Sequence, residues 1–453
     1  MSRLMVGVSG VRGIVGETLT GEVAEQFGLA FATMLGAGKT IALGRDTRTS
    51  GEMIRDAVVA GLTAGGIDVI DLGVVTTPGV ALMIKRLSAD GGVVVTASHN
   101  PLPYNGIKFM TPDGVNFPAP EAAQLKHIWE DGAYAPAARA GTVTANDTTH
   151  ETHVEAACGI VDVPAIAARR FKVALDSING AGCVGTVMLM ERLGCELIHI
   201  NAEPSGQFAH EPEPIAVNLG GLCDAVGTRG AEIGFAQDPD ADRLVIVDET
   251  GRFIGEEYTL ALTAAFVLSH RKGDLATNLS ATRMIDDVAS AAGVKLYRAP
   301  VGESNVAEAM VRHKCIFGGE GNGGVMDPRV VIVRDSFVGI ALMLHYLTAS
   351  GKTVGELVSA LPRYVMLKDK FACPLDAAPK IIAAARKDLL SRPQAAANEE
   401  DGLRVDLPVG WVHVRASNTE PIMRIVTEAE DAEAAGALAA DVRAIADEIL
   451  KGT

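Results

Sequence analysis

The acidic turn QDPDADR (237–243) holds three carboxylates at a spacing that suits a metal ion. Asp238, Asp240 and Asp242 alternate along the chain, so in an extended turn all three side chains can face one point. Hard oxygen ligands at this density are those that Mg²⁺ or Ca²⁺ prefers. Without a cation, the three carboxylates would repel one another and raise each other's pKa. The alternative interpretation is a solvated acidic loop.

The same turn matches part of an EF-hand calcium loop. Asp238, Asp240, Asp242 and Glu249 fall at the first, third, fifth and twelfth positions of that motif. The sixth position requires glycine for a sharp turn, and here it is Arg243. The following residues, LVIV, are typical of a strand, and no helix pair flanks the loop. These differences exclude an EF-hand.

A second polar turn, TASHNPLPYNGIK (96–108), follows a run of valines. Ser98 is a candidate nucleophile, and His99 or Lys108 is a candidate proton partner, because a serine hydroxyl needs a base to react. The alternative is a turn whose serine and asparagine side chains hydrogen-bond their own backbone, with Pro101 fixing the exit of the chain.

A third turn, FGGEGNGGVMDP (317–328), contains five glycines. Glycine lets the backbone approach a ligand closely. Glu320 and Asn322 supply a carboxylate and an amide, which are good partners for sugar hydroxyls or an amino group. The alternative is a flexible glycine turn without a ligand.

A fourth turn, RASNTEP (415–421), has the groups of a phosphate site. Arg415, Ser417, Asn418 and Thr419 can surround a phosphate with a guanidinium, hydroxyls, an amide and main-chain N–H groups. The alternative is a hairpin-like turn with local side-chain caps.

Three arginines lie in other glycine-containing turns. They are Arg12 in SGVRG (9–13) and Arg45 and Arg48 in GRDTRTSG (44–51). Such arginines can neutralise a phosphate during its transfer, and the alternative is that they are surface charges.

The elements that must position these turns alternate between strand and helix in three successive rounds. We expect strands at 40–44, 68–73, 171–176 and 195–200, two strands within 231–251, a strand-like stretch in CIFGGEGNGG, and helices carrying residues 23–34, 54–62, 185–194 and 258–270. Thr20 is expected to cap the first helix. Alternation of this kind predicts mostly parallel sheets covered on both faces, with ligand sites at the carboxyl ends of the strands.

The C-terminal part has a different pattern. Residues 410–430 read as two strands around a polar turn, and the last helix has Leu438, Val442, Ile445 and Ile449 on one face. We therefore predict an α/β protein with three similar α/β domains, whose sheets are mixed but mostly parallel, and a smaller C-terminal α+β domain. Segments 137–155 and 393–402 are expected to be linkers or loops.

Composition limits the partners of the chain. The formal net charge of −16 over 453 residues argues against nucleic-acid binding, and a phosphorylated small substrate would need a local basic pocket. Six cysteines without CxxC spacing argue against zinc and against a disulfide framework. We find no signal peptide and no membrane-spanning run, and expect a cytoplasmic protein.

The order of the four turns is more specific than any one of them. Ser-His-Asn-Pro, then DxDxDR, then GEGNGG, then RxSNTEP resembles the α-D-phosphohexomutase family, which contains phosphoglucomutases, phosphomannomutases and phosphoglucosamine mutases. The resemblance covers essentially the whole chain and implies four domains around a central cleft. On this basis we expect domains at 1–150, 151–250, 251–366 and 367–453, which carry the phosphoserine, metal, sugar-binding and phosphate-binding loops in that order.

The resemblance implies a role for each candidate residue. Ser98 would carry a phosphoryl group, and Asp238, Asp240 and Asp242 would hold one Mg²⁺ with an oxygen of phospho-Ser98 as a further ligand. The other implied site residues are Arg12 and Arg243 near the transferring phosphate, Lys108 for proton transfer, His99 positioning Ser98 or the phosphate, Glu320 and Asn322 on the sugar, and Arg415, Ser417, Asn418 and Thr419 as a clamp on the distal phosphate.

The implied reaction interconverts a hexose 6-phosphate and a hexose 1-phosphate. Phospho-Ser98 donates to the substrate, the hexose 1,6-bisphosphate reorients, and its other phosphate returns to Ser98; the bisphosphate is also the expected activator. Many hexose-specific members read Gly-Glu-x-Ser-Gly-His, where this chain has Asn322 and Gly324 in place of serine and histidine. Because the GEGNGG form resembles a branch associated with glucosamine phosphates, we expect a phosphoglucosamine mutase, with mannose and glucose phosphates as alternative substrates.

Two other functions compete with this interpretation. A Mg²⁺-dependent sugar phosphatase would have no need of the second phosphate site at 415–421. A catalytically silent sugar-phosphate binder would have no need of Ser98, Lys108 and the three aspartates. We expect the protein to be a monomer or a homodimer.

Overall fold

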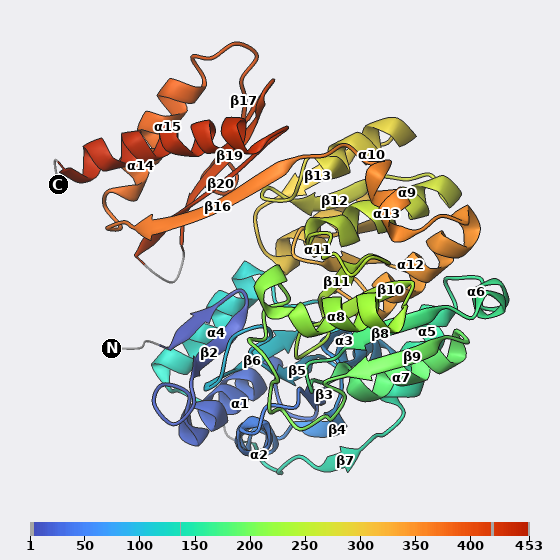
Figure 1. The fold of residues 1–453 in the computed structure, drawn as a ribbon. Coiled ribbons are helices and arrows are strands. Elements are labelled where there is room, and N and C mark those ends of the chain that lie inside the picture. Colours follow the sequence, from blue (N-terminus) through green and yellow to red (C-terminus); the bar gives the residue numbers. More distant parts are fainter. Residues whose placement is uncertain (1–3, 136, 418–420, 452–453) are drawn as a thin grey trace.

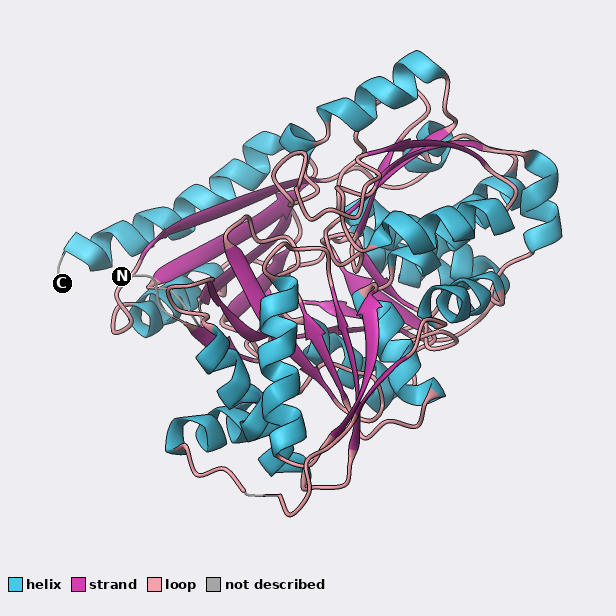
Figure 2. Ribbon diagram, turned by 90° about the horizontal axis from the view of Figure 1, so that it is seen from below, coloured by secondary structure: helices cyan, strands magenta, loops and turns pink. Residues whose placement is uncertain are grey.

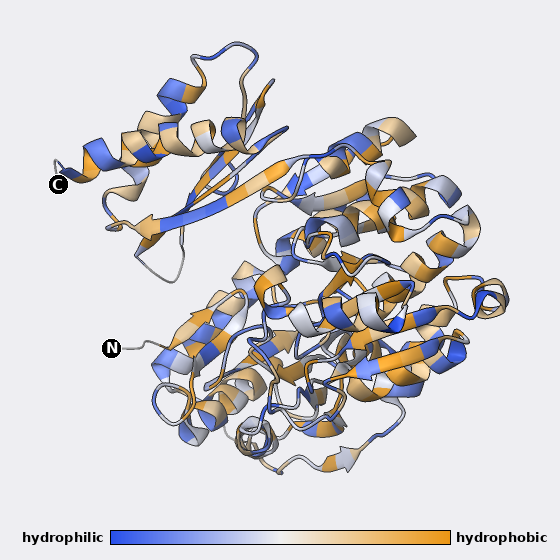
Figure 3. Ribbon diagram, in the orientation of Figure 1, coloured by the Kyte–Doolittle hydropathy of each residue, from blue (hydrophilic) through white to orange (hydrophobic). Residues whose placement is uncertain are grey.

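The computed structural model describes residues 4–135, 137–417 and 421–451, which form four β-sheets with helices packed against them (Figure 1). Strands within the molecule are coloured largely as hydrophobic, whereas hydrophilic residues gather on the outer faces of helices and in turns (Figure 3). Helices flank the strands, and the long C-terminal helix lies along one face of its sheet (Figure 2). No helix in the described residues is both long enough and apolar enough to cross a membrane.

The first sheet has seven strands in the order β1-β2-β6-β5-β3-β4-β7. Its strands are β1 (Met5–Gly7), β2 (Gly10–Ile14), β3 (Thr40–Arg45), β4 (Asp68–Val74), β5 (Gly92–Val95), β6 (Tyr104–Met110) and β7 (Val143–Ala145), and its helices are α1 (Gly21–Leu35), α2 (Gly51–Ala64), α3 (Thr77–Arg86) and α4 (Ala119–Asp131). Strands β5, β3, β4 and β7 run parallel, while β1, β2 and β6 join antiparallel. The Thr20 hydroxyl caps α1 by accepting from the Val23 N–H at 3.2 Å, as the sequence predicts.

The second and third sheets share a simpler plan of four strands each, in the orders β11-β10-β8-β9 and β13-β12-β14-β15. The second region contains α5 (Thr149–Cys158), α6 (Val163–Arg169), β8 (Lys172–Asp176), α7 (Gly182–Arg192), β9 (Glu196–Ile200), the 3₁₀ turn η1 (Ala216–Asn218), α8 (Gly220–Arg229), β10 (Ile233–Gln237) and β11 (Leu244–Val247). The third contains α9 (Glu257–His270), β12 (Leu275–Asn278), α10 (Met284–Ala292), β13 (Leu296–Ala299), α11 (Glu303–His313), β14 (Phe317–Glu320), β15 (Gly324–Met326), α12 (Ser336–Ser350) and α13 (Val354–Ser359). In each sheet three strands are parallel and one edge strand is antiparallel.

The fourth sheet is antiparallel throughout, in the order β16-β20-β19-β18-β17. It contains β16 (Val365–Ala372), β17 (Ala396–Asn398), β18 (Leu403–Leu407), β19 (Gly410–Ala416) and β20 (Ile422–Ala429), with α14 (Ala378–Leu389) and α15 (Ala432–Lys451). Leu438 and Val442 of α15 are buried in its core, and Ile445 and Ile449 pack at the edge of that core. The predicted fold class, three α/β units and a smaller α+β unit, is confirmed.

The expected linkers are partly wrong. Within 137–155, Val143–Ala145 pairs with β4 as an edge strand, and α5 begins at Thr149. Within 393–402, Ala396–Asn398 pairs with β18. Helix α5 escapes prediction because it has little apolar periodicity of its own and is held by packing against α3, α7 and α12.

The hydrophobic cores extend across the predicted domain ranges. One buried cluster joins residues of α3 and β5 to residues of α9 and α12, and another joins the second sheet to α12. The boundaries 1–150, 151–250, 251–366 and 367–453 therefore stay predictions, because α12 packs in buried clusters with the first, second and third sheets, while the fourth sheet has a core of its own.

Each polar turn singled out in the sequence follows the carboxyl end of an inner strand. Strand β5 leads to Ser98, β10 to Asp238, β14 ends at Glu320, and β19 leads to Ser417. An inner strand is hydrogen-bonded on both sides, so its end is held more firmly than a loop at an edge. The fold therefore gives all four turns a rigid base.

Candidate active site

Ser98 is buried and has a left-handed backbone conformation. Ser98 is 1% exposed, and its backbone φ is +48°. A non-glycine residue in this region costs of order 1–3 kcal/mol and persists only when its surroundings hold it there. The Ser98 N–H donates to Thr96 Oγ1 at 2.9 Å, and the Ser98 hydroxyl donates to Oδ2 of Asp238 at 2.7 Å. The turn thus satisfies part of its own backbone and also points its hydroxyl at the acidic turn.

Arg48 is the residue that holds the Ser98 turn. It is fully buried, and its Nη2 donates to the carbonyl oxygens of Ser98 and Asn100, each at 2.6 Å. Its Nε donates to Oδ2 of Asp46 at 3.1 Å, and that same oxygen accepts from Thr96 Oγ1 at 2.6 Å. Arg48 is therefore neither a surface charge nor a free phosphate ligand, the two roles considered for it.

The metal loop, residues 238–242, brings its three carboxylates together as the alternating sequence predicts. All three aspartates are fully buried, and one oxygen of each lies within 4.8 Å of the others. Ala241 has φ +54°, and its carbonyl oxygen accepts from Ser336 Oγ at 2.6 Å. The left-handed residue turns the chain so that alternate side chains point to one side.

The donor set fits a hard cation. Oδ1 of Asp240 and Oδ1 of Asp242 are buried and have no hydrogen-bond partner among the described residues. Buried carboxylate oxygens without a partner carry a desolvation cost that a bound cation removes. Burial, and then the charges of Asp242 and Asp240, raise the pKa of Asp238 well above its usual value, which is the repulsion expected of such a cluster.

Lys108 and Arg243 surround the same cluster with positive charge. The Lys108 Nζ is 2.7 Å from Oδ2 of Asp240 and 3.3 Å from Oδ2 of Asp242. Burial alone would lower the pKa of Lys108, but these two carboxylates outweigh it and raise that pKa. Burial would likewise raise the pKa of Asp240, and Lys108 outweighs it and lowers that pKa.

His99 accepts a hydrogen bond from the Arg243 guanidinium. Burial first, and then the charges of Arg243 and Arg12, lower the pKa of His99 to about 2. Its Nδ1 lies 2.8 Å from Nη2 of Arg243 and 3.3 Å from Oγ of Ser98. The Arg12 Nη1 donates to Oδ1 of Asn100 at 3.0 Å, so both arginines are anchored beside the serine turn. The structure thus shows His99 in contact with Arg243 beside Ser98, and its role stays a prediction.

The sugar loop, residues 320–324, meets the metal loop through Arg334. Oε2 of Glu320 lies 2.8 Å from Nη1 of Arg334, whose Nη2 lies 2.6 Å from Oδ2 of Asp242. Oε1 of Glu320 accepts from Asn278 Nδ2 at 2.8 Å. The Oδ1 of Asn322 accepts from the Gly324 N–H at 3.3 Å, so this amide stabilises its own loop.

Sequence reasoning missed Arg334, Glu303 and Asn116. Glu303, at the start of α11, accepts from the Arg334 N–H at 2.7 Å and from Asn116 Nδ2 at 2.8 Å. Burial raises the pKa of Glu303, opposed by the charge of Arg334. None of these three residues lies in a polar turn with a recognisable spacing, and only the fold brings them to the site.

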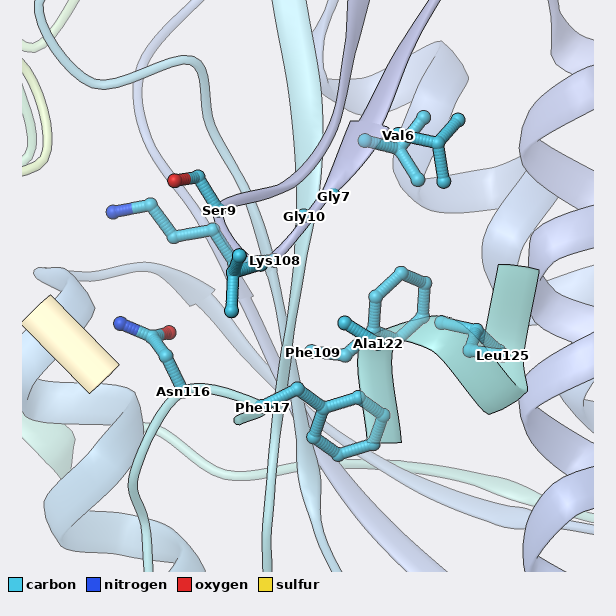
Figure 4. A pocket seen from close by; sticks show the side chains of 12 residues that line it. Val6, Gly7, Ser9, Gly10, Lys108, Phe109, Asn116, Phe117, Ala122 and Leu125 are labelled. Carbon is cyan, nitrogen blue, oxygen red and sulfur yellow. The ribbon is translucent and has the colours of Figure 1, made fainter. Parts of the chain in front are cut away.

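A small cavity lies beside Lys108, under the turn between β1 and β2 (Figure 4). Ser9, Lys108 and Asn116 are at its polar side, and Phe109, Phe117 and Leu125 are at its apolar side. The lysine stem thus runs beside apolar side chains while its ammonium reaches the metal loop. This arrangement matches the burial of Lys108.

The fourth turn is partly described. Arg415 in β19 faces Arg424 in β20 in the strand register, and its Nη1 is 3.5 Å from Oδ2 of Asp401. Burial lowers the pKa of Arg415, which Asp401 opposes and Arg424 reinforces, and the charge of Glu320 also acts on it. Ser417 is buried, and its N–H donates to the Ile422 carbonyl. Asn418 and Thr419 lie outside the described residues.

The fourth sheet is fixed to the third region through buried arginine contacts. Arg404 is 1% exposed, its Nη1 donates to the carbonyl of Leu279 at 2.6 Å, and its guanidinium lies 4.2 Å from the ring centre of Trp411. Nη2 of Arg283 donates to the carbonyl oxygen of Gly410 at 3.1 Å. The fourth sheet is therefore connected to the loop that follows β12.

These features are those of a phosphoryl-transfer enzyme: a buried serine hydroxyl is hydrogen-bonded to a cluster of carboxylates, and lysine and arginine side chains surround the cluster. Comparison with known families agrees: the phosphoglucomutase/phosphomannomutase alpha/beta/alpha domains I, II and III match residues 3–135, 151–251 and 255–364, and the C-terminal domain of the same family matches residues 365–445. The chain belongs to the phosphoglucomutase/phosphomannomutase family. Its activity is that of a phosphohexomutase, an isomerase that transfers a phosphoryl group within its substrate, and its substrates are sugar phosphates.

Relatives and a solved structure support this over the full length. A protein of Thermococcus kodakarensis named "Phosphoglucomutase/phosphomannomutase" is 40% identical, covering 95% of this chain and 96% of its own. A protein of Methanopyrus kandleri named "Probable phosphoglucosamine mutase" is 38% identical, covering 95% and 94%. The structure of a phosphoglucomutase/phosphomannomutase family protein from Burkholderia thailandensis superposes with a TM-score of 0.87 at 28% identity, covering 99% of both chains.

Proposed function

We propose that the protein interconverts glucosamine 6-phosphate and glucosamine 1-phosphate through phospho-Ser98 and a 1,6-bisphosphate. The observation that carries the mechanism is the 2.7 Å contact between the Ser98 hydroxyl and Asp238, within a buried cluster of three carboxylates. Sugar-phosphate chemistry at this serine needs alignment and charge neutralisation more than covalent assistance. The glucosamine assignment rests on the GEGNGG sugar loop.

The cation we propose is Mg²⁺, held by Asp238, Asp240 and Asp242 with a phosphoserine oxygen as a further ligand. When bound, it would supply Lewis-acid stabilisation of the transferring phosphoryl group. Support comes from the two carboxylate oxygens that have no hydrogen-bond partner among the described residues.

The chain's own residues divide the remaining work. Arg243 and Arg12, anchored beside Ser98 by His99 and Asn100, neutralise the phosphate as it transfers. Lys108, which the two carboxylates keep charged, would donate its proton to Ser98 Oγ as the phosphoryl group leaves, and the neutral lysine would then take the proton that the attacking sugar hydroxyl loses.

The sugar and the phosphate that does not react are held on the other side of the site. Glu320 binds sugar hydroxyls or the amino group, and Asn322 shapes the loop around it. Arg415 and Ser417, with Asn418 and Thr419, clamp the distal phosphate. Arg415 and Arg424 are partners in the strand register, and Arg415 also pairs with Asp401 at 3.5 Å; two positive charges opposite one carboxylate support an anion site here.

The test is a set of parallel reactions with glucosamine, mannose and glucose 1-phosphates. Each contains Mg²⁺ and a trace of the matching 1,6-bisphosphate as activator, and both the 6-phosphate and free phosphate are measured. We expect isomerisation to have its highest kcat/KM with glucosamine 1-phosphate. Higher kcat/KM with mannose or glucose phosphate would replace the sugar assignment, and release of phosphate without isomerisation would replace the mutase by a phosphatase.

We further propose that the protein acts in the cytoplasm as a monomer or a homodimer, with the four domain ranges given above. Light scattering on a sizing column gives the mass of the particle, and a mass of three or more chains would contradict the proposal. Limited proteolysis tests the boundaries, because cleavage is expected in the exposed segments beside them, at 137–148, 249–252 and 360–364; protection of all three segments would contradict the ranges.

A further inference from the structure

Arg334 stands where the metal loop and the sugar loop meet. Its Nη2 lies 2.6 Å from Oδ2 of Asp242 and its Nη1 lies 2.8 Å from Oε2 of Glu320. Its side chain is 8% exposed, so water screens these contacts little. One planar guanidinium therefore joins a carboxylate of the proposed cation site to a carboxylate of the proposed sugar site.

The backbone around Arg334 has hydrogen bonds of its own, and Glu303 contacts both the backbone and, at 3.5 Å, Nη2 of Arg334. The Arg334 N–H donates to Oε1 of Glu303 at 2.7 Å. Asp335 caps α12 by accepting from the Phe337 N–H at 2.9 Å, and Ser336 Oγ donates to the carbonyl of Ala241 in the metal loop at 2.6 Å. The guanidinium thus extends from a base that is itself tied to the loop it contacts.

Gly324 has no side chain because the Arg334 side chain occupies that space. A Cβ at position 324 would lie 2.1 Å from Cδ and 2.5 Å from Cγ of Arg334, well inside van der Waals contact. Glycine at position 324 and arginine at position 334 are therefore matched, because the Arg334 side chain packs directly against the Gly324 backbone.

The bridge leaves specific oxygens free. Arg334 and Lys108 occupy Oδ2 of Asp242, whereas Oδ1 of Asp242 has no hydrogen-bond partner among the described residues and only a long ion-pair contact of 3.9 Å with Nε of Arg243. A guanidinium fixes two carboxylates at a defined separation through its rigid fork, which a lysine ammonium cannot do. Loss of the fork would let Asp242 and Glu320, from different sheets, move apart.

We propose that Arg334 is a positioning residue that fixes the cation-binding carboxylate of Asp242 relative to the sugar-binding carboxylate of Glu320, and that Gly324 is matched to it. The effect of this Arg334 bridge on substrate binding and turnover rests on the proposed function. Its effect on cation binding does not, which allows the two proposals to fail separately.

The experiment compares Arg334→Ala and Arg334→Lys with a matched control, Arg312→Ala, in the full-length protein. Arg312 lies on α11 with a side chain 64% exposed, paired with Glu308. Mn²⁺ affinity is measured by electron paramagnetic resonance titration, glucosamine 6-phosphate affinity by calorimetry, and kcat and KM by the mutase assay. Both Arg334 variants are expected to weaken Mn²⁺ binding and lower kcat by about 10- to 100-fold, and Arg312→Ala is expected to change neither.

A second set of variants tests the match with glycine. Gly324→Ala alone is expected to lower kcat by about 100-fold, because Arg334 must shift by about 1 Å. In an Arg334→Ala background, which removes Cγ and Cδ, Gly324→Ala is expected to change kcat by less than about two-fold, the sign of a shared mechanism. Equal losses in both backgrounds would overturn the match.

The remaining outcomes are also decisive. A folded Arg334→Ala protein with unchanged Mn²⁺ affinity and kcat would overturn the positioning role. If Arg334→Ala fails to fold by circular dichroism, Arg334→Lys carries the test, since it keeps the charge and loses only the fork. If the unmodified protein isomerises no hexose phosphate while Arg334→Lys still weakens Mn²⁺ binding, the proposed function fails and the role of Arg334 stands.

Discussion

Replacement of Arg48 by methionine tests whether the Arg48 guanidinium stabilises the backbone of the Ser98 turn. The guanidinium of Arg48 is fully buried, is paired with Asp46, and donates to the carbonyl oxygens of Ser98, Asn100 and Tyr104. Arg48→Met keeps the aliphatic length and removes every one of these bonds. It leaves one buried carboxylate without its partner and three carbonyls without a charged donor.

The magnitude follows from the unpaired charge. Removing one partner of a buried ion pair costs about 3–5 kcal/mol, and the lost carbonyl contacts add to this without being strictly additive. We therefore expect the free energy of unfolding to fall by about 3–5 kcal/mol, and kcat to fall as well, because Ser98 loses the support for its left-handed backbone. Urea unfolding and the mutase assay measure the two effects.

The pH dependence gives a second signature. Burial already raises the pKa of Asp46, and Arg48 opposes that shift. Without Arg48 the pKa of Asp46 rises further, so the folded variant keeps a proton that the unfolded chain releases above about pH 4. A raised carboxyl pKa costs stability as the pH increases, so the deficit against the unmodified protein is expected to grow from pH 5 to pH 8.

Arg55→Met on α2 is the control. Its side chain is 26% exposed and pairs with Asp56 and Asp71, so a loss below about 1 kcal/mol is expected. A loss of the same size in Arg48→Met, with unchanged kcat, would refute the claim that Arg48 supports the serine turn.

Three further changes separate the parts of the site. Ser98→Ala is expected to lose nearly all turnover while calorimetry shows substrate affinity within about two-fold of the original; retention of most activity would contradict the phosphoserine. Arg415→Ala is expected to weaken substrate binding by about 1.5–3 kcal/mol, and unchanged binding would remove the clamp assignment. Burial raises the pKa of Glu257 to about 8, and the charge of Lys368 opposes this shift. Because the folded protein then holds a proton that the unfolded chain has released, the free energy of unfolding falls as the pH rises from about 5 to 8. Glu257→Gln is expected to reduce the fall in melting temperature over that range, and an unchanged slope would contradict the shift.

The positions of the strands were accessible from the sequence because apolar runs and turn residues mark them locally. The strand at 40–44, the helix capped by Thr20 and the two strands around the acidic turn appear where expected. Edge strand β7 cannot be predicted from the sequence, because its three residues are exposed and only the backbone pairing with β4 defines it. Local pattern predicts elements that carry their own apolar face, and misses those that tertiary pairing creates.

The candidate site divides in the same way. The three aspartates and Ser98 were found because their types and spacing are unusual within a few residues of chain. Arg334 could not be found, because its partners Asp242 and Glu320 lie on other segments, and its local sequence, VVIVRDS, is that of a strand and a helix cap. The one signal in the sequence is Gly324, and only the folded structure shows that the Arg334 side chain occupies the space a side chain there would need.

The docking of the fourth sheet has a consequence for the integrity of the other three. Arg404 and Arg298 both donate to carbonyls of the short loop 278–282, and Asn278 in that loop holds Glu320. A chain ending before β16 would lose Arg404 and leave the Leu279 carbonyl exposed to water in place of a buried donor. The fourth sheet thus supports the segment that holds Glu320, and a truncated protein is expected to weaken the proposed sugar site as well as lose the proposed phosphate site.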